Sequence, residues 1–102
     1  MSEGLTNRDI LDDCIAAIDS GRIKGHETWQ RVNMLLRQSE RIKGRSGQRL
    51  ARRSRITDSI FSAWVPDRED YERSRRHMLD WFKTTDSHNV ANLLRRARGR
   101  LS

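Results

Sequence analysis

Cationic side chains are concentrated between Arg41 and Arg55, a stretch of fifteen residues that contains seven Lys or Arg and no acid. Guanidinium and ammonium groups form charge-assisted hydrogen bonds with phosphate oxygens, so this composition predicts a polyanionic partner. From residue 45 onward, four of the cations are spaced i, i+4, i+7 and i+8, which places them on one stripe of a helix. The side chains expected to contact phosphates are Arg41, Lys43, Arg45, Arg49, Arg52, Arg53 and Arg55.

The second half of this region resembles a known motif. The segment "LARRSRITDSIFSAW" is similar, over residues 48–65, to the helix-turn-helix of phage-repressor-type DNA-binding proteins. The likeness is carried by Leu50, Ala51, Ile56, Thr57, Phe61, Ser62 and Trp64, and Arg55 falls where that family has its turn glycine. The resemblance implies an Arg-rich helix over 47–55, a turn, and a second helix over 57–65 that enters the major groove of duplex DNA. It also implies that Thr57, Ser59 and Ser62 contact base edges while the arginines contact phosphates.

Two other interpretations of the basic stretch stay open. In the first, a helical homodimer binds double-stranded RNA through the arginine stripe, because duplex RNA is recognised mainly by shape and by its phosphates. In the second, a phage or viral accessory protein uses its basic face on an acidic protein partner and binds no nucleic acid. We favour binding of duplex DNA, in a regulatory or a phage or mobile-element accessory role, by a protein that we expect to be a homodimer. Salt distinguishes nucleic-acid binding from a hydrophobic protein interface, since nucleic-acid affinity falls steeply with salt concentration.

The charge of the whole chain agrees with a polyanionic partner. Among 102 residues, 21 Lys and Arg outnumber 14 Asp and Glu, which gives a net charge of +7. Acids exceed bases before residue 21, whereas residues 41–55 and 95–100 are basic. No apolar run reaches the ~20 residues of a membrane span, and the first residues lack the pattern of a signal peptide. The sequence therefore predicts a soluble intracellular protein, cytoplasmic or nuclear, with no membrane partner.

Catalytic chemistry is not indicated. His26, His77 and His88 are scattered along the chain, and no set of His, Cys, Asp or Glu has the spacing of metal ligands. No glycine-rich loop precedes a helix in a phosphate-binding pattern. The single cysteine, Cys14, lies on the apolar side of a predicted helix and is interpreted as a small core residue. We therefore expect a non-enzyme with no catalytic residues, metal or cofactor.

The spacing of apolar residues predicts an all-α fold, a compact bundle of five or six short helices in one domain over 1–102. No segment alternates with period two, so no strand is expected. The helices are expected after a cap at Thr6 or Asn7 and up to Ser20-Gly21, within 26–43, within 47–65 with an interruption near Ser54, within 68–83 after an Asp67 cap, and from Asp86 or Ser87 to Gly99. Residues 99–102 are expected to form a frayed tail. Leu50 to Trp64 and all three tryptophans are expected to pack in the core.

Overall fold

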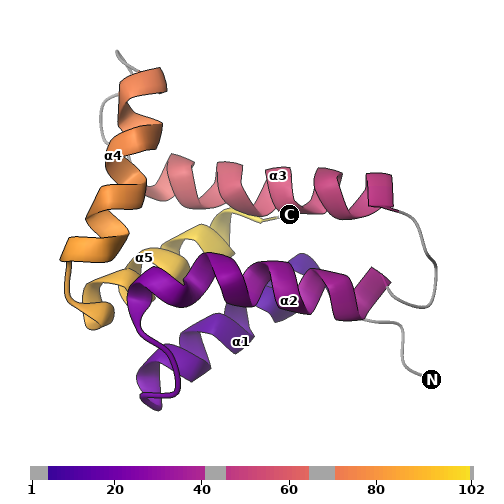
Figure 1. The fold of residues 1–102 in the computed structure, drawn as a ribbon, viewed down its shortest axis with the longest axis horizontal. Helices are drawn as coiled ribbons and strands as arrows, with labels where there is room; N and C mark the ends of the chain where they lie inside the picture. The colour runs from indigo at the N-terminus through magenta and orange to yellow at the C-terminus, as the bar shows by residue number, and fades with distance from the viewer. Residues whose placement is uncertain (1–4, 41–45, 65–70, 102) are drawn as a thin grey trace.

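A computed structural model describes residues 5–40, 46–64 and 71–101 of the chain. These residues form five α-helices and one turn of 3-10 helix, with no strand among them, so the all-α prediction is confirmed. The elements are α1 (Asn7–Asp19), η1 (Gly25–Glu27), α2 (Thr28–Glu40), α3 (Ser46–Trp64), α4 (Tyr71–Thr84) and α5 (Ser87–Arg100). Figure 1 shows α2 and α3 running along the long dimension of the molecule, while α4 stands across one end.

Helix α1 begins and ends where its sequence predicts. The Thr6 hydroxyl accepts a hydrogen bond from the Asp9 backbone N–H at 3.1 Å, and the Asp9 carboxylate accepts one from the Thr6 N–H at 3.0 Å. This reciprocal capping box satisfies N–H groups that have no partner inside the helix. At the other end, Gly21 adopts a φ of 78°, a left-handed conformation that favours glycine after a helix.

The short helix η1 connects α2 to the start of α5. The Gly25 N–H donates to Ser87 Oγ at 2.9 Å, and the buried Thr28 hydroxyl donates to the Gly25 carbonyl at 2.7 Å. A Cβ atom at Gly25 would lie 2.6 Å from Val90 Cγ2, closer than side chains approach each other. Gly25 is therefore required by the close approach of η1 and α5, and this approach fixes where α5 begins.

Helix α3 is continuous from Ser46 to Trp64, where a helix-turn-helix was predicted. Ser54 and Arg55, expected at the turn, lie in the helix interior, and no described non-glycine residue has a positive φ. The turn glycine of that motif supplies a backbone conformation that arginine disfavours, whereas arginine is a good helix former. The predicted turn is therefore wrong, and Thr57 stands in mid-helix instead of at a helix start.

Helix α5 is capped by Asp86, whose carboxylate accepts from the His88 N–H at 3.1 Å. Residues 99–102 were predicted to form a frayed tail. In the structure α5 instead continues to Arg100, and Leu101 is only 8% exposed. The Leu101 carbonyl accepts hydrogen bonds from Arg8 Nη2 at 2.8 Å and from Nε at 3.3 Å. These contacts attach the end of α5 to α1 as far as residue 101. The predicted Asp67 cap of α4 lies outside the described residues.

One hydrophobic core draws on all five α-helices. Its fully buried large side chains are Ile10, Leu11, Val32, Leu36, Ile56, Ile60, Met78, Phe82, Val90, Leu93 and Leu94. The three tryptophans are partly buried and pack against this core. Ring centroids lie 5.3 Å apart for Trp29 and Phe82, 5.5 Å for Phe82 and Trp81, and 6.4 Å for Trp81 and Trp64. This row of rings joins α2, α4 and α3 at one end of the bundle.

Candidate functional site

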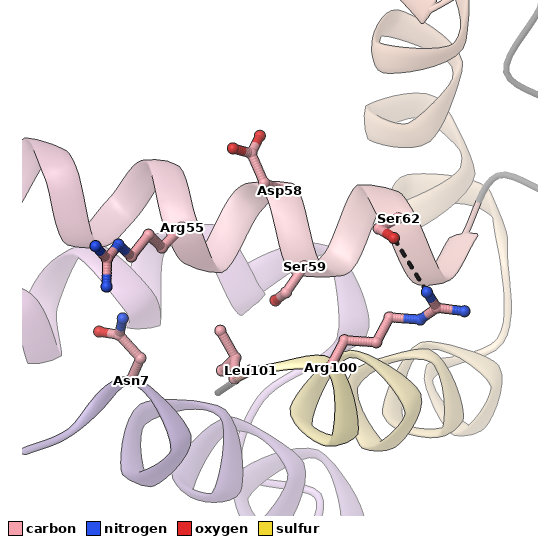
Figure 2. A pocket seen from close by; sticks show the side chains of 7 residues that line it. All are labelled: Asn7, Arg55, Asp58, Ser59, Ser62, Arg100 and Leu101. Carbon is pink, nitrogen blue, oxygen red and sulfur yellow. Dashed lines mark hydrogen bonds between the residues drawn. The ribbon is translucent and has the colours of Figure 1, made fainter.

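A groove of about 450 Å³ lies between α3, the end of α5 and the start of α1. It is lined by Asn7, Arg55, Asp58, Ser59, Ser62, Arg100 and Leu101. Figure 2 shows Arg55 reaching toward Asn7 on one side and Arg100 reaching toward Ser62 on the other, with Leu101 between them. The Asp58 side chain points away from Leu101 and Asn7 (Figure 2). We call this cavity the basic groove.

The two arginines of the basic groove form no ion pair with the described residues, so their charge is available to an anion. Arg55 is exposed. Arg100 Nη1 donates to Ser62 Oγ at 3.2 Å, which orients the guanidinium along the groove and uses one of its five N–H donors. Arg100 is itself an exposed residue.

Three other arginines contact carboxylates of α1. Arg95 pairs with Asp19, Arg98 pairs with Asp12, and Arg31 Nε lies 2.5 Å from Asp13 Oδ1. The acidic helix α1 is thus neutralised by α2 and by one edge of α5. Arg96 and Arg100 are spaced i, i+4 on α5 and share the opposite edge, so only that edge keeps its charge available.

The predicted phosphate contacts are placed in different surroundings. Arg41, Lys43 and Arg45 lie outside the described residues, and Arg49 lies near the start of α3. Arg52 is directed into the molecule: its Nε donates to Asn7 Oδ1 at 2.9 Å and its Nη2 donates to the Leu5 carbonyl. Arg53 is exposed but does not line the basic groove, whereas Arg55 does. Arg52 therefore holds the segment before α1, which is a structural contact.

The hydroxyl groups that were expected to contact bases form hydrogen bonds within the protein. The Thr57 hydroxyl donates to the Arg53 carbonyl at 2.8 Å. Ser59 is only 8% exposed, and its hydroxyl donates to the Ile56 carbonyl at 2.9 Å, so in this structure the hydroxyl is directed at its own helix. Ser62 lines the basic groove, where it accepts from Arg100. Among these three, only Ser62 lies beside an available arginine.

Asn7 and Arg100 are groove residues that the sequence interpretation missed. Asn7 was considered only as a helix cap, and Arg100 was assigned to a frayed tail. The Asn7 amide oxygen accepts from Arg52, which leaves the amide nitrogen as a donor that points toward Arg55 (Figure 2). The i, i+4 spacing of Arg96 and Arg100 is the sequence signal that could have indicated a basic edge on α5.

The single cysteine and the side chains that could hold a metal ion bear on reactive chemistry in the part of the chain that the structure describes. Burial raises the pKa of the Cys14 thiol to about 12, so the reactive thiolate is not formed at neutral pH. No three His, Cys, Asp or Glu side chains in residues 5–40, 46–64 and 71–101 are placed to hold a metal ion. None of the helices in these ranges combines the length and the apolar character that a membrane span requires.

Comparison of the chain with protein-family models, with curated proteins and with solved structures found no match.

Proposed function

We propose that this protein binds nucleic acid through its phosphate backbone, with Arg55 and Arg100 of the basic groove as the central contacts. One observation carries the proposal: two exposed arginines from helices far apart in the sequence line one cavity, and neither forms an ion pair within the described residues. Guanidinium groups stay charged at all physiological pH values and match two phosphate oxygens at once. The excess of cations over the whole chain attracts the same partner.

A neutral donor complements the two charges. The Asn7 amide nitrogen lies on the wall of the basic groove, and amide groups are common partners of phosphate oxygens. Asp58 also lines the groove and would repel a phosphate, but its carboxylate points away from Asn7 and Leu101 (Figure 2). Arg96 extends the cationic edge by one turn of α5.

The proposal concerns the backbone of the nucleic acid and not its sequence. Base reading by α3 required a separate second helix, and α3 is instead continuous with Ser59 buried against its own backbone. Contacts to phosphates position a protein on nucleic acid but carry no sequence information. We therefore expect similar affinity for different sequences of the same strand type.

The test is fluorescence anisotropy with labelled DNA and RNA at about 50 and 200 mM salt. The variant that carries both Arg55→Ala and Arg100→Ala should bind about tenfold more weakly, which corresponds to ~1.4 kcal/mol. The matched control carries Arg37→Ala and Lys83→Ala, which remove the same charge from exposed sites on α2 and α4. The control should bind within about twofold of the wild type, because only screened long-range attraction is lost.

Equal losses in the two variants would contradict the assignment of the basic groove. Absence of binding to every nucleic acid by the folded protein would favour the alternative partner, an acidic protein whose carboxylates meet the same arginines. Sedimentation velocity of the free protein tests the homodimer that was expected from the sequence.

A further inference from the structure

We infer that the basic groove takes a single strand of nucleic acid in preference to a duplex, an inference that rests on the proposed function above. The chemistry of the ligand is then a flexible sugar-phosphate chain that enters a cavity between helices. The strand type expected from the helix-turn-helix resemblance was duplex DNA, and the inference replaces it for a geometric reason.

The cations lie along a concave surface. Readers of duplex DNA commonly insert a protruding helix into the major groove, which is about 12 Å wide. In this protein the corresponding stretch of α3 lies against the bundle, with Ile56 and Ile60 fully buried and Ser59 nearly so, and its exposed residues Arg55 and Asp58 line the basic groove. The arginines flank a cavity whose lining includes the buried Leu101. A duplex is too rigid to bend into such a cavity. A single strand can enter it, because its backbone bends between phosphates.

The length of the basic groove also fits a short run of phosphates. Arg55 and Ser62 are seven residues apart on α3, a distance of about 10 Å along the helix axis. Phosphates of one strand are spaced by ~3.4 Å along a stacked helix and by more in an extended strand, so this distance spans at most about three phosphate-to-phosphate steps. Arg55 lies at one end of this track, and Arg100 lies at the other beside Ser62.

The lining also sets the expected strength of binding. None of the groove-lining residues is aromatic, so the stacking contacts that strengthen many single-strand binders are not provided there. Affinity must then come mainly from phosphates. Because the lining supplies two cations, Arg55 and Arg100, about two phosphates are neutralised, and on a single strand the slope of log affinity against log salt should be near about −1.4.

The experiment compares three fluorescein-labelled ligands of about ten nucleotides at ~50 mM salt: oligo-dT, the corresponding RNA strand, and a DNA duplex. We expect the single strands to bind at least ~5-fold more tightly than the duplex, and Arg55→Ala with Arg100→Ala to remove most of this affinity. In a second variant, Ser62→Glu places a carboxylate beside Arg100 and should weaken single-strand binding about tenfold. Its control, Thr57→Glu, adds the same charge to α3 outside the lining of the groove. Circular dichroism confirms that each variant is folded.

The outcomes separate the two proposals. Duplex binding that equals or exceeds single-strand binding, and that still depends on Arg55 and Arg100, overturns the inference and leaves the proposed function standing. Binding that is indifferent to these arginines, or no binding to any ligand, overturns both. Equal effects of Ser62→Glu and Thr57→Glu show that the strand does not enter the groove.

Discussion

The two halves of α3 belong to one continuous helix but have opposite surroundings. In the first half, Leu50 is 53% exposed and Ala51 is also exposed. In the second half, Ile56 and Ile60 are fully buried. The end of α5 lies against the second half, where Arg100 reaches Ser62. The difference shows that apolar residues with helical spacing predict a helix, while their burial depends on whether another element covers them.

The largest effect that this comparison predicts concerns two aliphatic residues ten positions apart. Ile60→Ala should lower the free energy of unfolding by about 2–5 kcal/mol, because it leaves a cavity in a closely packed core. Leu50→Ala should change it by less than about 0.5 kcal/mol, since most of that side chain already contacts water. Urea denaturation followed by circular dichroism measures both. Similar losses in the two variants would mean that the first half of α3 is also packed.

Within the first half, two adjacent arginines should also differ. Arg52→Ala removes hydrogen bonds to Asn7 and to the Leu5 carbonyl, and should lower the free energy of unfolding by about 1–3 kcal/mol. Arg53→Ala removes the same charge from an exposed side chain and should have little effect on stability. The same denaturation measurement compares them. A stable Arg52→Ala protein would show that the segment before α1 is held by other contacts.

These differences explain which parts of the fold could be predicted. Helix boundaries at Thr6, Gly21 and Asp86 depend on local hydrogen bonds and backbone preferences, and the sequence patterns indicated them correctly. The predicted turn near Arg55 is not formed, because arginine is a good helix former and disfavours the positive φ that the motif needs at this position. Local signals thus decide the helices, and a partial motif match does not override them.

The basic groove could not be predicted from the sequence, for a different reason. Arg55 and Arg100 are separated by 45 residues, and only the packing of α5 on α3 brings them to one cavity. Likewise, the local sequence does not show that Arg52 contacts Asn7 while its neighbour Arg53 is exposed to solvent. A count of basic residues predicts the class of partner, while tertiary contacts determine which cations remain available to it.

Cys14 provides a pH-dependent test of the packed half, because it lies in the same hydrophobic cluster as Ile56 and Ile60. Burial raises its pKa from 9.0 to about 12. Above pH 9 the unfolded chain loses this proton while the folded chain keeps it, so stability falls as pH rises from 9 toward 12. The fall is at most about 1.4 kcal/mol per pH unit. Cys14→Ala lacks this contribution, and its stability relative to the wild type should improve between pH 8 and pH 10. Parallel pH profiles would contradict the burial of the thiol.

The smallest expected difference is between two adjacent arginines of α5, the helix that covers the second half of α3. Arg95 pairs with Asp19 across to α1, whereas Arg96 is exposed and forms no ion pair with any described residue. Arg95→Ala should lower the free energy of unfolding by about 0.2–1 kcal/mol, the usual range for an exposed ion pair. Arg96→Ala should leave it unchanged. Because salt screens exposed pairs over ~3 Å at 1 M, the difference should disappear in 1 M sodium chloride. A difference that persists at high salt would mean that Arg95 stabilises the fold by its hydrogen bond to Asn92 or by packing instead of by its ion pair.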